Sequence, residues 1–373
     1  MDATAIRFRL RALRERNNLT QGQLASSLGF KDRQTLSQIE LGERTLGFQE
    51  MVRAADVFGV GVDYFSDPFE LAGEGEFSWR QTNADVNALD AFEHTAGRWI
   101  AAFRYLARLR GDSIHSSLRR VALTSKSSFE DAVAEGEAIG AALGLGEIPS
   151  ARLAEAVQER LDTLVLYVDT VRGVSGAACQ LDQLNAVLIN RREPPARRSY
   201  DLAHELFHLL TWQTMPPKHV ESTDGIHSTD KNEKRVEQLA ENFAAGLLMP
   251  TKTINAILIN SPPPAGVALA GWLRAVAPQL GVSGPALKWR LLNMGVLKQS
   301  QLVALSDDLL RSNVDEGNIN PPARYSKRFV SAISWGIDEG HVSARRVAQL
   351  LDSSVDDLRD LFSEHGLSAP FDL

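Results

Sequence analysis

The chain has 373 residues, of which 44% are hydrophobic and 23% charged, and its formal net charge is -7. These values describe a globular protein of two or three domains, and the negative charge excludes indiscriminate nucleic-acid binding by the whole surface. Cys179 is the one cysteine, so disulfides within the chain and multi-thiolate zinc sites are excluded. Because we find neither the apolar core of a signal peptide nor a stretch able to span a bilayer, we expect a cytoplasmic protein with no membrane partner.

The charge is distributed unevenly along the chain. Residues 1–66 hold 9 Lys and Arg against 8 Asp and Glu, so the remainder of the chain holds the whole negative excess. A near-neutral first segment can present a local basic face to DNA even though the whole protein is acidic.

Residues 5–65 have the pattern of a compact run of short helices. A capping box of Thr20 and Gln23 predicts the start of one helix, and Asp32 is the expected N-cap of the next. We interpret residues 67–85, which begin Gly-rich and acidic and contain a proline, as a linker.

A second domain is predicted over residues 86–260, with its core at 130–260. The segments 164–170 and 185–192 have the apolar, β-branched character of strands, whereas most of the domain has helical spacing. Residues 261–373 are expected to form a helical C-terminal region. The predicted fold class is therefore mainly α, of the α+β type, with a small sheet in the middle domain.

The strongest chemical signal is the motif His-Glu-Leu-Phe-His at residues 204–208. On a helix, residues four apart lie on one face about 6 Å apart along the axis, so two imidazoles can face one ion. Glu205 would lie beside that ion, where it can take a proton from water and pass it to a leaving amine. We predict Zn²⁺ as the cofactor, His204 and His208 as ligands and Glu205 as the catalytic base. The alternative is a structural or vestigial site.

A catalytic zinc needs a third protein ligand and an open fourth position. Glu233, Glu237 and Glu241 follow at four-residue spacing on a predicted helix, and we predict that Glu237 is the ligand. Glu241, one turn further on, is expected to hold the free N–H of a ligand histidine. The alternative for this stripe is a solvated acidic face.

The group that would stabilise the oxyanion is left open by the sequence. Tyr200 lies one turn before the motif and is more typical of core packing. His219 and His227 lie in a polar loop, where a histidine is more often a surface residue.

Three sequence segments resemble the ImmA/IrrE family of zinc metallopeptidases: NAVLINRR, YDLAHELFHLL and VEQLAENFAAGLLMP. The resemblance covers roughly residues 130–260 and implies a zincin-like domain of the His₂Glu type. It implies the same ligands, His204, His208 and Glu237, with Glu205 catalytic, while Glu241 replaces the family's usual Asn. It also implies a protein substrate, a cognate XRE-type repressor cut in stress response or mobile-element control.

The segment LTQGQLASSLGFKDRQTLSQIELGER resembles the XRE (Cro/CI-type) helix-turn-helix, which implies a DNA-binding domain at residues 1–66. In that resemblance the second helix enters the major groove of an operator, where Arg reads guanine and Gln reads adenine. The expected DNA contacts are the base readers Arg33, Gln34 and Gln38 and the phosphate-contacting residues Gln21 and Arg44. Domains of this type often dimerise, so a homodimer stays open, as does a protein-binding use of the same fold.

These features together predict a DNA-binding transcriptional regulator with a zinc-dependent endopeptidase domain. Two alternatives stay open. In one, the peptidase-like domain is a non-catalytic sensor of a metal or ligand, and in the other it is an antitoxin-like module that binds a partner protein.

Overall fold

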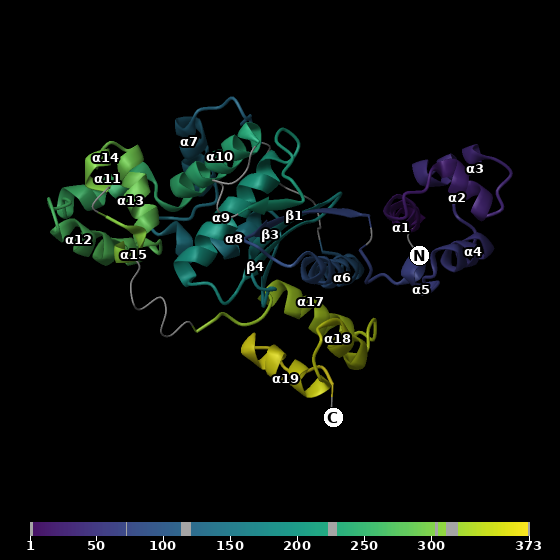
Figure 1. Ribbon diagram of the computed structural model, residues 1–373. Coiled ribbons are helices and arrows are strands. Elements are labelled where there is room, and N and C mark those ends of the chain that lie inside the picture. The colour runs from purple at the N-terminus through teal and green to yellow at the C-terminus, as the bar shows by residue number, and fades with distance from the viewer. Residues whose placement is uncertain are drawn as a thin grey trace. The chain divides into compact units, whose positions relative to one another are not determined.

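The computed structural model describes residues 3–71, 73–112, 121–222, 230–302, 305–310 and 320–371. It is mainly helical with one small mixed sheet, which confirms the predicted fold class (Figure 1). The chain forms two compact units. The first comprises Met1–Glu76, Leu89–Ile114 and Ser331–Leu373, and the second comprises Phe77–Ala88 and His115–Val330.

The first unit is built from helices alone, apart from the start of one strand. They are α1 (Ala3–Arg16), α2 (Gln21–Ser27), α3 (Arg33–Leu41), α4 (Phe48–Phe58), α5 (Asp63–Ser66), most of α6 (Val86–Arg110) and of α17 (Lys327–Asp338), α18 (Ala344–Leu350) and α19 (Val355–Glu364). The predicted capping box is present, because the Thr20 side chain accepts from the Gln23 amide and the Gln23 side chain accepts from the Thr20 amide. Asp32 caps α3 by accepting from the Thr35 amide, as expected.

Helix α6 packs with the C-terminal helices inside the first unit. The Trp99 indole N–H donates to the Leu350 carbonyl at 3.0 Å, and a side chain at Gly336 would meet Leu106. The domain boundaries predicted from the sequence therefore differ from those of the structure. From Leu89 onward α6 belongs to the first unit, and the region 261–373 divides between the two units at residue 331. Helical spacing does not reveal such divisions, because it is the same whichever core a helix joins.

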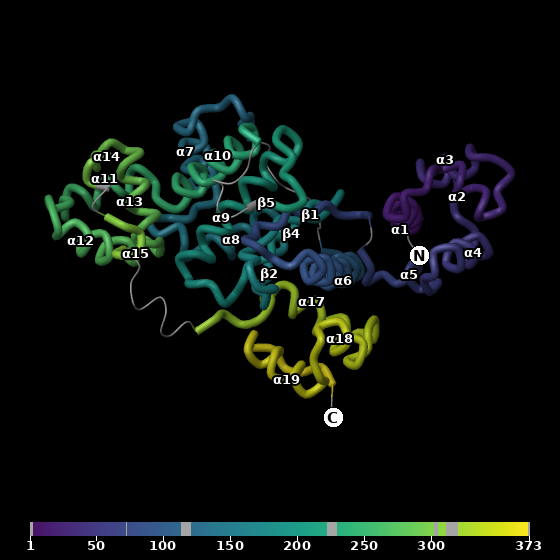
Figure 2. Tube along the Cα trace, viewed as in Figure 1, coloured from purple at the N-terminus to yellow at the C-terminus, as the bar shows by residue number. Residues whose placement is uncertain are grey.

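The second unit contains a five-stranded sheet in the order β2-β4-β3-β1-β5, and Figure 2 labels its two edge strands, β2 and β5. Its strands are β1 (Gly75–Gln81), β2 (Leu164–Val168), β3 (Val174–Leu181), β4 (Asn185–Asn190) and β5 (Val220–Ser222). Strands β2 and β4 run parallel, β3 and β4 antiparallel, and β5 runs parallel to β1 at the edge. Strands β2 and β4 lie where the sequence predicted strands. The linker prediction for residues 67–85 is wrong over β1, where Phe77 and Trp79 are buried.

The second unit also contains helices, one of which carries the polar motif. They are α7 (Phe129–Ala142), α8 (Leu153–Arg160), α9 (Pro195–Thr211), α10 (Lys231–Leu248), α11 (Thr251–Asn260), α12 (Ala268–Val276), α13 (Gly284–Asn293), α14 (Gln299–Leu302) and α15 (Asp307–Leu310). Helix α9 packs against β3 and β4 and against α10, and α10 packs on α7 (Figure 1). Every residue of α9 from Asp201 to Thr211 is buried. A helix buried on all sides keeps its polar side chains away from water.

Two glycines allow α7 and α10 to pack closely. A Cβ atom at Gly136 would collide with the Phe243 carbonyl, and one at Gly246 would collide with the Val133 carbonyl. Because both obstacles are backbone atoms, they cannot rotate away. The close packing fixes α10, and with it the acidic stripe at its start.

Replacing Gly246 with valine is expected to lower the free energy of unfolding by about 1–3 kcal/mol, because the added side chain overpacks the α7–α10 contact. Chemical denaturation of the purified protein measures this. Gly271→Val is the matched control, since a Cβ at Gly271 on α12 meets nothing within 4 Å. Equal stability of both variants would contradict the close-packing account.

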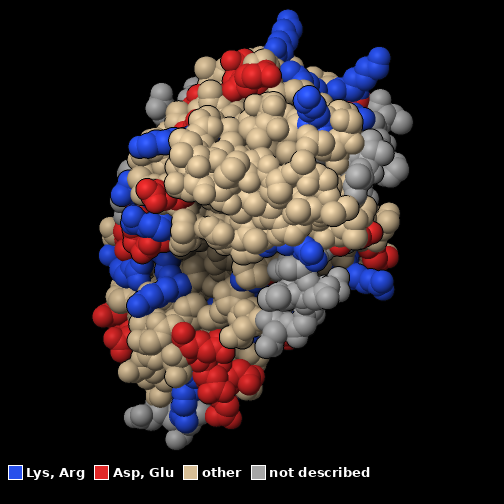
Figure 3. Space-filling model, turned by 90° about the vertical axis from the view of Figure 1, so that its left-hand side faces the viewer, with Lys and Arg blue, Asp and Glu red and all other residues tan. Residues whose placement is uncertain are grey.

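Helices α11 and α12 present a face with few charged side chains (Figure 3). Ile259 near the end of α11 and Val267 just before α12 are 82% and 99% exposed. Within the described residues, no helix is both long and apolar enough to cross a membrane.

Candidate functional site

Two imidazoles meet on the buried face of α9. His204 and His208 are both fully buried, their Nε2 atoms are 3.0 Å apart and their ring centroids are 4.8 Å apart. Burial lowers the pKa of both groups, that of His208 to about 3. Both rings are therefore neutral at physiological pH, which is the form that binds metal.

Glu237 on α10 completes the predicted cluster. Its Oε2 atom lies 3.3 Å from His204 Nε2, and its Oε1 atom lies 3.6 Å from His208 Nε2. The carboxylate thus faces both imidazoles from a different helix. The structure brings together the three residues that the sequence proposed as ligands.

The three side chains fit a zinc ion. Zn–N bonds of about 2.0–2.1 Å meeting at the tetrahedral angle place two nitrogens about 3.3 Å apart. The observed 3.0 Å between the two Nε2 atoms is close to that separation. Two neutral imidazoles and a carboxylate are also a donor set that zinc accepts, so the residues present fit the ion.

A fourth group lies at the same place and was missed by the sequence analysis. Glu221, on the edge strand β5, has its Oε2 atom 3.3 Å from His208 Nε2. One ligand atom from each of His204, His208, Glu221 and Glu237 falls within 4.8 Å of the others. Only the alternation in the short segment His-Val-Glu-Ser could have indicated a strand there, and three residues are too few for periodicity to predict.

Glu205 is fully buried beside the cluster, and its side chain passes over Gly176 of β3. Neither of its carboxylate oxygens accepts a hydrogen bond within the described residues. Burial, reinforced by Asp201 and Glu237 and opposed by Arg80, raises the pKa of Glu205 well above its usual value. A carboxyl group with a raised pKa holds and releases a proton nearer to neutral pH, as a general base requires.

A buried ion pair holds the start of the motif and was also missed. Arg80 on β1 donates from Nη1 to Asp201 Oδ1 at 2.9 Å, and Arg197 lies 3.2 Å from the other oxygen of Asp201. Arg80 is 5% exposed and Asp201 is fully buried. Asp201 precedes Glu205 by one helical turn, so the pair connects the sheet to the part of α9 that carries the motif. An arginine inside an apolar strand, Phe-Ser-Trp-Arg, was the available signal.

Of the remaining residues named from the sequence, those that the structure describes lie outside the cluster. Glu241 does not make the contact predicted for it, because its side chain is exposed and neither His204 Nδ1 nor His208 Nδ1 has a hydrogen-bond partner within the described residues. The Tyr200 hydroxyl donates to the main-chain carbonyl of Glu241 at 3.0 Å, and its ring packs on the core. The main-chain carbonyl of His219 accepts from Trp79 in the sheet. His227 lies outside the described residues.

Helix α3 presents the side chains named as base readers. Arg33, Gln34 and Gln38 are all exposed, whereas Leu36 and Ile39 are buried in the core of the bundle. This alternation places the three polar side chains on the outer face of the helix. The outer face of α3 is therefore accessible, as a recognition helix requires.

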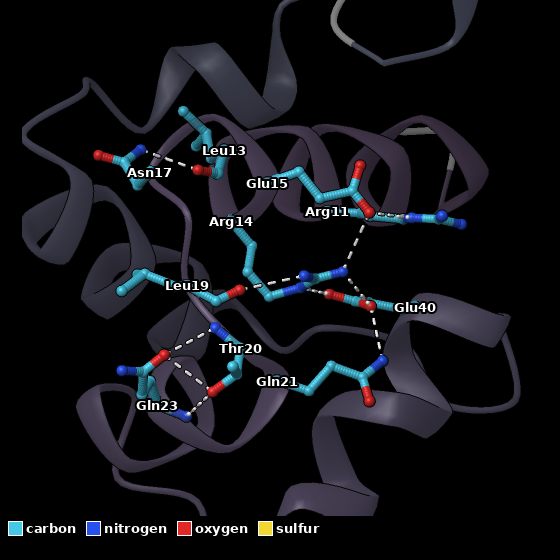
Figure 4. A network of polar contacts seen from close by, with 10 residues as sticks. All are labelled: Arg11, Leu13, Arg14, Glu15, Asn17, Leu19, Thr20, Gln21, Gln23 and Glu40. Atoms are coloured by element: carbon cyan, nitrogen blue, oxygen red, sulfur yellow. Dashed lines mark hydrogen bonds and ion pairs between the residues drawn. The ribbon is translucent and has the colours of Figure 1, made fainter.

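The two residues named for phosphate contact are engaged within their own domain. Gln21 donates to Glu40 at 2.9 Å, and Glu40 also pairs with Arg14, as Figure 4 shows. Arg44 pairs with Glu50 at 2.7 Å and lies over the Phe30 ring. These contacts leave both side chains half-buried at the ends of short helices.

Comparison with known families agrees with the two resemblances. Residues 10–65 match the helix-turn-helix family model, and residues 158–291 match the peptidase family model described as the IrrE N-terminal-like domain. The second match begins later and ends later than the predicted core at 130–260, and it takes in α11, α12 and most of α13. A search of the curated proteins finds no match. The chain thus joins an N-terminal helix-turn-helix to a peptidase-like domain of IrrE type.

Proposed function

Because one chain joins a helix-turn-helix domain to an IrrE-type peptidase domain, we propose that it is a DNA-binding regulator with zinc-dependent endopeptidase activity. The observation that carries the proposal is the convergence of His204, His208 and Glu237 beside the buried carboxyl group of Glu205. Zinc at this place would polarise a peptide carbonyl and lower the pKa of water.

The chain's own residues would then perform the proton transfers. Glu205 takes the proton of the attacking water and delivers it to the departing amine nitrogen, which restores its carboxylate. Arg80 and Asp201 hold α9 against the sheet, so that Glu205 keeps its place while its proton moves. Burial of the carboxyl group keeps bulk water from competing for that proton.

We propose an XRE-type repressor as the protein substrate, in the control of stress response or of a mobile element. A helix-turn-helix on the same chain would bring the peptidase domain to operator DNA, where such a repressor is bound. The effective concentration of the peptidase domain near the repressor would then rise. A homodimer on a two-fold operator and a cytoplasmic location belong to the same proposal.

The test is to mix the purified, zinc-loaded protein with XRE-type repressors encoded beside its gene and to follow cleavage by mass spectrometry. We expect a defined cut that disappears on chelation and in Glu205→Gln. If the neighbouring repressors all stay intact in the presence of the zinc-loaded protein, the endopeptidase proposal is wrong.

Zinc binding itself should depend on the α9 imidazoles. His204→Ala is expected to weaken zinc binding by at least about tenfold to hundredfold, because a ligand contributes no less than the groups that orient it. Competition with a chromophoric chelator measures the dissociation constant. His94→Ala is the control, since His94 lies on α6 in the other unit. Unchanged affinity in His204→Ala would show that zinc binds elsewhere.

A second candidate function is a metal sensor without catalysis. Glu221 favours it, because four protein ligands are typical of structural zinc sites, whereas catalytic sites keep an open position. In that case Glu205→Gln would leave gene regulation intact, while a variant of the recognition helix would abolish it.

DNA recognition should depend on the outer face of α3. Arg33→Ala is expected to weaken binding to a selected DNA sequence by about 5- to 150-fold, the equivalent of about 1–3 kcal/mol for one bidentate contact to a base. The sequence is selected from a random pool with the parent protein, and titration of labelled duplex gives the affinity. Arg53→Ala on α4 removes the same charge from an exposed position. If both variants lose affinity equally for all sequences, α3 does not read bases.

A further inference from the structure

The edge of the sheet contributes an acidic side chain to the site on α9 and α10. Strand β5 has three residues, and its middle residue, Glu221, is 9% exposed. The Glu221 Oε2 atom is buried, faces His208 Nε2 at 3.3 Å and has no hydrogen-bond partner within the described residues. A buried carboxylate oxygen without a partner that is aimed at an imidazole pair points to a cation as its missing partner.

The second carboxylate strengthens this argument. Glu237 is 15% exposed and faces the same two imidazoles from helix α10, whereas Glu221 faces them from strand β5. Two carboxylates that share one buried place repel each other when both are ionised, unless a cation lies between them. Within the described residues, Arg80 forms its ion pair with Asp201 and with neither of these two carboxylates.

We propose that Glu221 is a fourth protein ligand of the metal in the resting protein and that it occupies the position that water needs for peptide hydrolysis. The resting site is then closed, and the protein cleaves its substrate only after the Glu221 carboxylate has left the ion. This inference rests on the proposed function, because it concerns the metal of that same centre.

Opening the site requires an exchange of ligands. One carboxylate oxygen leaves the ion and one water molecule enters, with no change in the number of protons or electrons. The structure provides a place for the released carboxylate. Arg80 is the register partner of Glu221 in the β1–β5 pair, and paired residues of neighbouring strands project to the same face of a sheet. The Arg80 Nε atom is buried and has no hydrogen-bond partner within the described residues.

The position of β5 suits a switch of this kind. Within the described residues β5 is the outermost strand and pairs with β1 alone, so its other edge can accept the backbone of an extended peptide. A protein substrate that pairs with β5 would move Glu221 as it binds. The closed state would then protect other proteins of the cell from cleavage until a substrate of the right backbone geometry arrives.

The test uses the full-length protein loaded with cobalt, whose visible spectrum reports the ligands of the ion, and acetohydroxamate as a small probe that needs open positions on the metal. We expect Glu221→Gln and Glu221→Ala to bind the probe at least about tenfold more tightly than the parent, and to bind zinc about 10- to 100-fold more weakly. Glu233→Gln is the matched control, because Glu233 lies on α10 one turn before Glu237 and pairs with Lys218.

Each outcome decides the matter. Tighter probe binding with weaker zinc binding in both Glu221 variants, but not in Glu233→Gln, supports the closed site. If the parent and both Glu221 variants bind zinc and probe alike, Glu221 is not a ligand, although the proposed peptidase remains. If the parent binds neither zinc nor cobalt, the proposed function fails together with this inference. Two variants of different size are used so that a folding defect in one leaves the other to give the result.

Discussion

Glu205→Gln is expected to lower the rate of substrate cleavage by about 10²- to 10⁴-fold, the range that a positioned general base contributes. The amide cannot accept the proton of the attacking water, whereas its size and shape match the carboxyl group. Glu205 is not among the residues whose ligand atoms cluster around the proposed metal position, so zinc affinity should stay near that of the parent. Single-turnover cleavage and a zinc competition assay separate the two effects.

The same substitution should stabilise the metal-free protein at neutral pH. Burial raises the pKa of Glu205 above its usual value of 4.5, so between that value and the folded pKa the native state binds more protons than the unfolded state. The contribution of Glu205 to stability therefore falls as the pH rises through this window, and glutamine removes that loss. Thermal unfolding of the metal-free proteins should show a larger gain for Glu205→Gln at pH 7 than at pH 4.5.

The control for both measurements is Glu233→Gln, an identical chemical change at a surface ion pair. A cleavage rate in Glu205→Gln within a few-fold of the parent would assign the base to another residue. A lower melting temperature at pH 7 would mean that Glu205 is stabilised by contacts other than those described.

Asp201→Ala is expected to lower the free energy of unfolding by about 3–5 kcal/mol, since it leaves a buried charge without its partner. Arg80 would lose its ion pair at 5% exposure, and Arg197 would lose its contact with the same carboxylate. The variant should also lower the pKa of Glu205, because the negative charge of Asp201 helps to raise it. Denaturation curves give the stability, and the pH dependence of cleavage reports the change in pKa.

A double-mutant cycle supplies the control for this pair. Arg80→Met keeps much of the arginine volume without its charge, so the double variant should be more stable than Asp201→Ala alone. If the two single effects simply add, Arg80 and Asp201 do not stabilise each other. The effect of Asp201→Ala on stability would then come from its contact with Arg197.

The sequence by itself determined how the two histidines of α9 are arranged, because that arrangement is local. Four-residue spacing on a helix places His204 and His208 on one face whatever the rest of the chain does. The helix caps at Thr20 and Asp32 could be predicted from the sequence for the same reason, since a capping side chain bonds a backbone N–H within three residues of itself. Glu237 was one of three acidic candidates on the α10 stripe, and the structure places it beside both imidazoles, while its role as a ligand stays a prediction.

The tertiary structure alone decided which distant groups surround that local motif. Glu221 and Arg80 lie at the site on two paired strands that are far apart in the chain. The periodicity of neither segment predicts that pairing. Because local periodicity does not show which distant segments pack together, the sequence predicts a linker where β1 lies. For the same reason it does not place α6 in the first unit. Glu241 shows the converse, because helical spacing placed it one turn from a ligand but could not show that its side chain turns to solvent. A local pattern determines which side chains share one face of a helix. Which other elements pack against that face depends on the packing of the whole unit.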